Sequence, residues 1–339
     1  MPLFVERLLE GKDLSREEAH EAMDTIMGGD ATESQIAGFL IALRAKGETA
    51  DEIAGCAQAM RDHTVFVHPR RTDLVDTAGT GGDGAGTINI STAAALLAAA
   101  AGAGVAKHGN RAVSSSCGSA DVLEALGFEL DQPPDVVERS IDDLGFGFLF
   151  APSHHPAMRH AASVRRELAT RTVFNVLGPL TNPAGAGAQV IGVYSHHLVQ
   201  TIANVLSQLG SHHAFVVHGA GGIDEFSPVG PNHVCEVVDG AVHERTVEPE
   251  ELGIPRCHLE ELAGGTPEEN ANAIRRVFAG ELGPRRDAVL FNAAAAIAAA
   301  NGTGDLRAGL DLARSALDSG AGYERLDALV AFSRSGALT

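Results

Sequence analysis

The chain has 339 residues, of which 45% are hydrophobic, and a formal net charge of −19. This length predicts two domains, or one domain with a large elaboration, and the apolar fraction suffices for a sizeable core. The negative charge argues strongly against a nucleic-acid groove, because such a groove needs a basic surface.

A small all-helical domain is predicted for residues 1–68. Helices are expected at residues 15–27, 32–43 and 49–60. The first of these should begin at a capping box, because Ser15 and Glu18 stand three residues apart ahead of apolar residues at helical spacing.

Strands alternating with helices are predicted for the larger second domain, residues 69–339. Strands are expected at residues 72–76, 104–107, 147–150, 188–194 and 214–218, with helices such as 89–102 and 198–209 between them, a hairpin at 234–242 and helix from 287 onward. This alternation predicts an α/β fold with a mostly parallel central sheet and chemistry at the carboxyl ends of its strands. A helical segment around 165–185 is expected to pack on the small domain.

The chain carries no charged side chain between residues 84 and 106, a length that suggests a membrane span. Asn89, Ser91, Thr92 and several glycines lie within it, so a buried helix is the better interpretation. The four cysteines lack C-x-x-C spacing, and the chain starts without a basic-then-apolar leader. We therefore expect a cytoplasmic protein with neither membrane nor nucleic acid as partner.

A glycine-rich loop follows the first predicted strand, at residues 76–83. Its Gly79-x-Gly81-x-x-Gly84 spacing satisfies the dinucleotide-binding pattern, which also requires an acid about 20 residues further on. Residues 98–105 contain no acid. Asp83 within the loop would repel a bare pyrophosphate but suits one that carries a divalent cation. The loop therefore predicts a site for a magnesium-loaded phosphorylated sugar.

Three further segments follow predicted strands. Lys107 to Arg111 and the serine run after them offer phosphate donors. The adjacent His154 and His155 do not share a helix face, which argues against metal ligation by this pair; Arg165 follows them, and Arg166 is expected on a solvated helix face. Asp224 and Glu225, on a loop, could converge on a hard cation. The pairs 196–197 and 212–213 are expected to be surface histidines.

These segments together resemble the anthranilate phosphoribosyltransferase family of tryptophan biosynthesis, and the resemblance runs nearly end to end. The matching segments are residues 79–83, 89–92, 107–111, 118–124, 175–183 and 224–225. The resemblance implies transfer of the phosphoribosyl group of 5-phosphoribosyl 1-diphosphate (PRPP) to the amine of anthranilate, with release of pyrophosphate. It also implies a nucleoside phosphorylase-like fold, a homodimer and two bound magnesium ions.

The resemblance also assigns residues by position. For PRPP it implies Gly79, Gly82, Asp83, Thr87, Asn89, Ile90, Ser91, Thr92, Lys107, His108, Gly109, Asn110, Arg111, Ala112, Val113, Ser114, Ser115 and Ser119. For magnesium it implies Ser91, Asp224 and Glu225, and for anthranilate Gly79, Asn110 and Arg165. Two positions depart from the family pattern, Ser116 where lysine is frequent and Ala169 where glycine follows the leucine.

Lys107, His108 and Arg165 are the predicted catalytic residues. Lys107 would neutralise charge on the departing pyrophosphate, and Arg165 would pair with the anthranilate carboxylate. His108 either accepts the proton lost by the amine or packs against the aromatic ring.

Two related activities are alternatives, a pyrimidine nucleoside phosphorylase and a non-catalytic nucleic-acid-binding protein of the same fold. The first need not have an arginine for a benzoate, and the net charge of −19 opposes the second. The commoner phosphoribosyltransferases carry two adjacent acids before their loop, whereas Asp76-Thr77 offers one.

Overall fold

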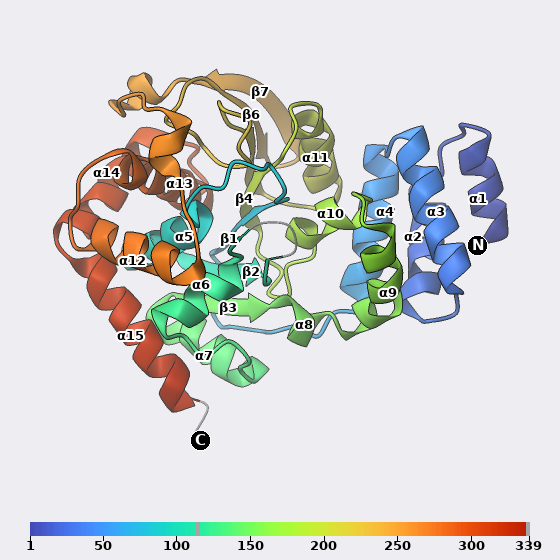
Figure 1. The fold of residues 1–339 in the computed structure, drawn as a ribbon, viewed down its shortest axis with the longest axis horizontal. Helices are drawn as coiled ribbons and strands as arrows, with labels where there is room; N and C mark the ends of the chain where they lie inside the picture. The colour runs from blue at the N-terminus through green and yellow to red at the C-terminus, as the bar shows by residue number, and fades with distance from the viewer. Residues whose placement is uncertain (113–115, 337–339) are drawn as a thin grey trace.

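A computed structural model describes residues 1–112 and 116–336 of the chain. A seven-stranded sheet with helices on both faces forms the larger part, and four N-terminal helices stand beside it (Figure 1). The predicted Val113, Ser114 and Ser115 lie outside the described residues. The predicted fold class, a helical unit beside a mostly parallel α/β sheet, is confirmed.

The strands are β1 (Leu74–Gly79), β2 (Gly104–Gly109), β3 (Phe146–Phe150), β4 (Ala188–Gly192), β5 (His213–His218), β6 (Asn232–Val238) and β7 (Ala241–Val247). The α-helices are α1 (Pro2–Leu9), α2 (Arg16–Met27), α3 (Glu33–Lys46), α4 (Ala50–Asp62), α5 (Ile90–Ala100), α6 (Ser119–Leu126), α7 (Pro134–Leu144), α8 (Ala151–His154), α9 (Arg159–Leu168), α10 (Phe174–Leu177), α11 (His197–Gln208), α12 (Pro267–Phe278), α13 (Pro284–Ala300), α14 (Leu306–Asp318) and α15 (Ala321–Gly336). Short 3₁₀ turns are η1 (Pro156–Met158), η2 (Gly178–Leu180), η3 (Pro249–Leu252) and η4 (Leu259–Leu262).

Three helices of the N-terminal unit, α2, α3 and α4, begin where the sequence predicts, and α1 precedes them. Ser15 caps α2 with Glu18 completing the capping box, as expected. Thr32 and Thr49 cap α3 and α4 in the same way. Each box satisfies two backbone N–H groups that the first helical turn leaves free, so these starts are encoded locally.

The sheet has the order β3-β2-β1-β4-β5-β6-β7. The first five strands are parallel, and β6 and β7 add an antiparallel hairpin at one edge. Because β2 lies on one side of β1 and β4 on the other, the strand order reverses between β1 and β4. Open α/β sheets bind ligands at such a switch point, beyond the carboxyl ends of the strands.

Two large apolar clusters hold these layers together. On one face of the sheet, α5 and α13 pack against each other and against β1, and both helices are rich in buried alanine. On the other face, α11 packs against β5 and β6, and its cluster continues into α2, α3 and α4. The N-terminal helices therefore share a core with one face of the sheet.

The segment between β3 and β4 reaches the N-terminal helices (Figure 1). Helix α9 packs against α2 and α3, and α10 packs against α4. The division of the chain between residues 68 and 69 stays a prediction. Among the described residues, no helix is both long and apolar enough to cross a bilayer.

Close approach of α13 and α14 depends on one glycine. A Cβ at Gly309 would overlap the carbonyl oxygen of Ala294 on α13. We expect Gly309→Ala to lower the free energy of unfolding by roughly 1–3 kcal/mol, because an overpacked helix contact must shift. The exposed Ser315→Ala on the same helix should change it by less than about 0.5 kcal/mol. Urea unfolding of both variants measures the difference, and equal stabilities would contradict the packing.

Candidate active site

Two glycines face each other at the switch point. Gly79 ends β1 and pairs in register with Gly192, the last residue of β4. A Cβ at Gly79 would overlap the carboxylate of Asp224, and a Cβ at Gly192 would overlap its backbone. The missing side chains therefore allow the loop after β5 to enter the crevice between the two strands.

Backbone donors hold the two carboxylates of this loop. Gly81 N donates to Asp224 Oδ2 over 2.6 Å, and Ser91 N donates to Glu225 Oε1 over 3.2 Å. Asp83 lies alongside, because its Oδ2 accepts from Asp224 N over 3.3 Å. The glycine loop, the start of α5 and the Asp224-Glu225 loop, which are far apart in sequence, thus meet at one place.

A buried amide fixes the turn that carries these acids. Asn292 on α13 accepts from Phe226 N over 2.9 Å and donates to Phe226 O over 2.7 Å. The residue Phe226 adjoins Glu225, so α13 sets the position of both carboxylates. Sequence patterns did not indicate Asn292, because its partner lies 66 positions away.

The positive charge near Asp224 and Glu225 is too small to keep both carboxylates at their ordinary pKa values. Burial raises the pKa of Asp224 to about 7, and the neighbouring Asp83 adds to the rise. Burial and Asp224 likewise hold the pKa of Glu225 well above its ordinary value, although Lys107 opposes them. A cation bound here would lower both pKa values, because it favours the ionised forms.

Lys107 lies inside the sheet, whereas we expected the strand to end at this residue. Strand β2 runs to Gly109, and Lys107 is 1% exposed, with Nζ donating to the Thr77 carbonyl over 2.5 Å. Burial lowers its pKa, and the acids Asp76 and Glu225 oppose that effect. The lysine is therefore a buried counter-charge beneath the carboxylates.

Asp76, which begins the glycine-loop segment, also has a structural role. Its Oδ1 accepts from His108 N over 3.1 Å, and its Oδ2 accepts from the Asn182 side chain over 2.8 Å. Burial raises its pKa to about 6, with Lys107 opposing the rise. This acid joins β1 to β2 beneath the site rather than facing a ligand.

A small cavity marks the meeting point of these elements. It has a volume of about 10 Å³ and is lined in part by Thr77, Ser91, Asp224 and Glu225. That volume admits about one water-sized particle. Within the described residues, no group of three or more His, Cys, Asp or Glu side chains could hold a metal. Two carboxylates beside an open space nevertheless suit Mg²⁺, which binds few carboxylates and takes its other oxygens from substrate phosphates and water.

The first turn of α5 lies in the same region, and its first two backbone N–H groups are engaged, Ile90 N by the Ile88 carbonyl over 2.7 Å and Ser91 N by Glu225 Oε1 over 3.2 Å. Residues 90–92 begin this 11-residue helix, whose N-terminus favours anionic ligands. The Thr92 hydroxyl is buried and has no hydrogen-bond partner among the described residues. Asn89 instead braces the next loop, because its Nδ2 donates to the Cys117 carbonyl over 3.1 Å.

The predicted PRPP residues outside this meeting point divide into two groups. Gly82 belongs to the glycine loop, and Thr87 forms an isolated bridge with Ala263 at the end of that loop. Ser119 starts α6, and its Oγ donates to Asn110 O over 3.3 Å. Ser119 and Asn110 therefore lie together at the turn after β2, apart from the glycine loop that carries Gly82.

The charge of Arg111 is paired with two acids on α6. Its guanidinium donates to Glu124 over 2.8 and 3.0 Å and to Asp121 over 3.2 Å. These acids hold its pKa above the ordinary value. Asp121 also accepts from Ala112 N over 2.8 Å. The arginine thus stabilises the turn after β2, and the sequence pattern did not reveal these acidic partners.

Arg165 lies on α9, which packs on the N-terminal helices, and it has no acidic partner in the described part of the chain. It is half-buried, with its guanidinium carbon 5.1 Å from the centre of the Phe174 ring. Burial lowers its pKa. Its side chain makes no ion pair or hydrogen bond with any residue that the structure describes. The neighbouring Arg166 is exposed, as expected.

Arg171 received no role from the sequence yet contacts the glycine loop. It donates to the Gly82 carbonyl and lies over the Tyr194 ring, 3.7 Å from its centre. Shortly before it, Ala169 ends α9 with φ of 46°, in the left-handed region. The glycine expected there by the family pattern would adopt this conformation without strain.

Both ring nitrogens of His108 are engaged by the protein. Nδ1 lies 3.0 Å from the Gly178 carbonyl, and Nε2 lies 3.2 Å from Nε2 of His155. Burial, with a smaller effect of His155, lowers the pKa of His108 to about 3. This geometry favours a packing role for the ring over the alternative of a proton acceptor.

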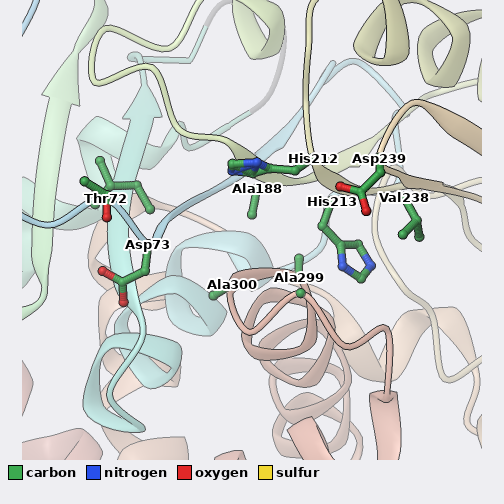
Figure 2. Close-up of a pocket in the computed structure, with 11 residues that line it drawn as sticks. Thr72, Asp73, Ala188, His212, His213, Val238, Asp239, Ala299 and Ala300 are labelled. Atoms are coloured by element: carbon green, nitrogen blue, oxygen red, sulfur yellow. The ribbon is translucent and has the colours of Figure 1, made fainter.

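A larger cavity of about 130 Å³ lies at the other end of the parallel strands, and Figure 2 shows residues that line it. It lies at the amino ends of β1, β4 and β5, where parallel sheets do not place their chemistry. His213 on its wall is 4% exposed and its Nε2 lies 2.9 Å from Glu236. The expectation of a surface histidine at 213 was therefore wrong, because the residue opens strand β5.

The chain matches two family descriptions in succession. Residues 71–323 match the glycosyl transferase family, a/b domain, and residues 3–64 match the helical bundle domain of that family. Fold and site thus define a glycosyl transferase with a helical bundle beside an α/β domain. The chain is 52% identical to the anthranilate phosphoribosyltransferase of Moorella thermoacetica, over 97% of each chain. It belongs to the anthranilate phosphoribosyltransferase family.

Solved structures agree over nearly the whole length. The anthranilate phosphoribosyltransferase of Thermus thermophilus has a TM-score of 0.92 and 50% identity, covering 98% of this chain and 99% of that one. The Saccharomyces cerevisiae enzyme in complex with PRPP and Mg has a TM-score of 0.89 and 30% identity, covering 98% of each chain. The same yeast enzyme in complex with 4-fluoroanthranilate has a TM-score of 0.87 and 29% identity, covering 98% and 97%.

The raised pKa of Asp224 predicts a pH-dependent stability. Its folded value of about 7 exceeds the unfolded value near 3.9, so the folded protein binds more protons between these pH values. Stability of the metal-free protein should therefore fall as pH rises from 5 to 7. We expect Asp224→Asn to remove roughly 2–3 kcal/mol of this fall in denaturant unfolding. The exposed Asp239→Asn is the control; identical slopes for both variants would contradict the assignment.

Proposed function

We propose that this chain transfers the phosphoribosyl group of PRPP to the amine of anthranilate, giving N-(5-phosphoribosyl)anthranilate and pyrophosphate. The observation that carries the proposal is the pair of buried, under-compensated carboxylates, Asp224 and Glu225, beside the glycine loop. Such a pair suits a diphosphate that arrives with its cation. Membership of the family supplies the identity of the acceptor.

In this proposal PRPP lies along the switch point and the turn after β2. Its proposed contacts are Gly79, Gly82, Asp83, Thr87, residues 89–92, residues 108–115 and Ser119, whereas Lys107 acts through its buried charge. Ser91, Asp224 and Glu225, which line the small cavity, would hold two magnesium ions. Magnesium bound there supplies positive charge that stabilises the departing pyrophosphate.

The protein groups act mainly through charge. Bond breaking at the anomeric carbon leaves positive character on the ribose and negative charge on the pyrophosphate. The N-terminus of α5, the positive end of the helix dipole, would stabilise that negative charge without rearrangement. Lys107 acts from below, because its buried charge limits the repulsion among the acids rather than contacting the pyrophosphate.

Anthranilate binding is proposed for Gly79, Asn110 and Arg165. A half-buried arginine with no carboxylate partner within the described chain can form a two-bond contact with the anthranilate carboxylate. That contact orients the aromatic amine, which is uncharged at neutral pH and attacks without prior deprotonation. Arg165 is thus a positioning group for the acceptor.

A homodimer is proposed through the outer face of the helical unit. Leu3 and Leu9 on α1 are 70% and 69% exposed, and Ile41 on the adjacent α3 is 40% exposed. Exposed apolar groups gathered on neighbouring helices are typical of an association surface. We also propose a cytoplasmic location and no nucleic-acid partner, the latter supported by the net charge of −19.

A direct assay tests the activity. Purified protein with PRPP and Mg²⁺ should consume anthranilate, followed by the loss of its fluorescence, and chelation of the metal should abolish the reaction. Phosphorolysis of pyrimidine nucleosides, assayed in parallel, should be absent. Phosphorolysis without consumption of anthranilate would replace the proposal with the nucleoside phosphorylase alternative.

Arg165→Ala tests the acceptor site. Loss of a partly desolvated two-bond ion pair should raise the KM for anthranilate about 10- to 100-fold, while the KM for PRPP changes less than about threefold. The adjacent, exposed Arg166→Ala is the matched control and should leave both constants unchanged. Equal increases in both KM values for Arg165→Ala would count against this role.

A further inference from the structure

A buried chain of hydrogen bonds joins His108 to the end of the helical unit. His108 Nε2 lies 3.2 Å from His155 Nε2, and His155 Nδ1 lies 3.1 Å from Thr64 Oγ1. Thr64 follows the end of α4 and also lies within hydrogen-bond distance of the Met60 carbonyl, at 2.9 Å. Both histidines are more than nine-tenths buried.

The acceptors in this chain determine where its protons lie. The Gly178 carbonyl can only accept, so Nδ1 of a neutral His108 carries the proton. Its Nε2 is then an acceptor and needs the N–H of His155 Nε2. His155 Nδ1 is left as an acceptor for the Thr64 hydroxyl, so one set of proton positions satisfies every group between Thr64 and Gly178.

The opposite orientation would place two nitrogen lone pairs against each other. If Thr64 donated to Met60 and accepted from His155 Nδ1, both Nε2 atoms would lack a proton unless one ring were charged. Burial opposes that charge, since it lowers the pKa of His108 to about 3 and that of His155 to about 4. The charged Lys107 and the His154 ring also disfavour it, and the backbone of Thr181 only partly offsets the effect at His155.

We infer that His155 is a positioning residue that fixes His108 in its neutral, Nδ1-protonated form, so that the ring presents a carbon face instead of a nitrogen to the acceptor substrate. This role rests on the proposed function, because the anthranilate ring is what that face would meet. The proton that the amine loses after attack then passes to the departing pyrophosphate or to water rather than to His108. Thr64 sets the orientation of His155, and the end of α4 thereby contributes to the acceptor site.

Histidine ¹⁵N labelling tests the proton positions without any substrate. Two-bond ¹H–¹⁵N spectra should show His108, assigned by its loss in His108→Asn, as a neutral Nδ1–H ring from pH 5.5 to 8.5. His155→Leu should make His108 titrate within this range, because water reaches its free Nε2. His154→Leu, which removes a neighbouring buried imidazole bound to the Val65 carbonyl, should leave the His108 signals unchanged.

Kinetics of three variants separate positioning from simple packing. His155→Leu should lower kcat/KM for anthranilate about tenfold at pH 6, with recovery toward pH 8. His155→Gln places an amide N–H near the Nε2 position, so it should stay within about twofold of the parent and show no such pH dependence. Thr64→Val should reduce kcat/KM in the parent but not in the His155→Gln background, because glutamine has no counterpart of Nδ1.

The outcomes distinguish this inference from the proposed function. A charged His108, an Nε2–H ring, or a His108 spectrum unaffected by His155→Leu would overturn the inference, even with full activity. The predicted spectra in a protein that consumes no anthranilate would instead overturn the proposed function. A loss of activity in His155→Leu that is equal at every pH and is shared by His155→Gln would also overturn the positioning role.

Discussion

Negative charge buried at the switch point of the sheet is the constraint on which the rest of this structure depends. Asp224 and Glu225 enter the crevice between β1 and β4 because Gly79 and Gly192 leave room for them. Uncompensated carboxylates in such a place raise the free energy of the folded state, as their raised pKa values record. A bound cation would offset this cost, so the same arrangement that lowers stability favours the cation binding that we propose.

The surrounding elements limit this electrostatic strain without removing it. Lys107 supplies one buried positive charge beneath the acids, and Asn292 holds their turn against α13. The glycine loop and the first turn of α5 supply backbone donors. A magnesium-loaded diphosphate would supply the positive charge that is still missing. Binding of PRPP with its cation would therefore also relieve the repulsion among the buried carboxylates.

The proposed anthranilate site differs in charge from the proposed PRPP site. Arg165 is a cation without an anionic partner in the described chain, and His108 is a histidine held away from its charged form. In the proposed function the first would attract the anthranilate carboxylate, and the second would offer an uncharged surface to its aromatic ring. Arg165 lies on α9, which packs on the N-terminal helices, and the His108 chain ends at α4. The helical unit thus contacts the elements that carry both residues of the proposed acceptor site.

Local patterns in the sequence predict those parts of the molecule that depend on local physics. Capping at Ser15 and the alternation of strands with helices follow from neighbouring residues, and both were confirmed. The burial of Lys107 was not predicted, because it depends on Asp76 and Glu225, which only the folded sheet brings beside it. The same holds for the acidic partners of Arg111 and for His155, whose contact with His108 spans 47 positions. Family resemblance assigns residues to ligands but does not give their protonation or burial.

Calorimetric titration of PRPP into the protein at pH 8, with and without Mg²⁺, tests the central claim most directly. The account predicts that PRPP binds at least about tenfold more tightly with Mg²⁺, and that Asp224→Asn removes most of this difference because the repulsion that the cation relieves is gone. Equal affinity for PRPP with and without the metal, or a metal effect of the same size in Asp224→Asn, would contradict it.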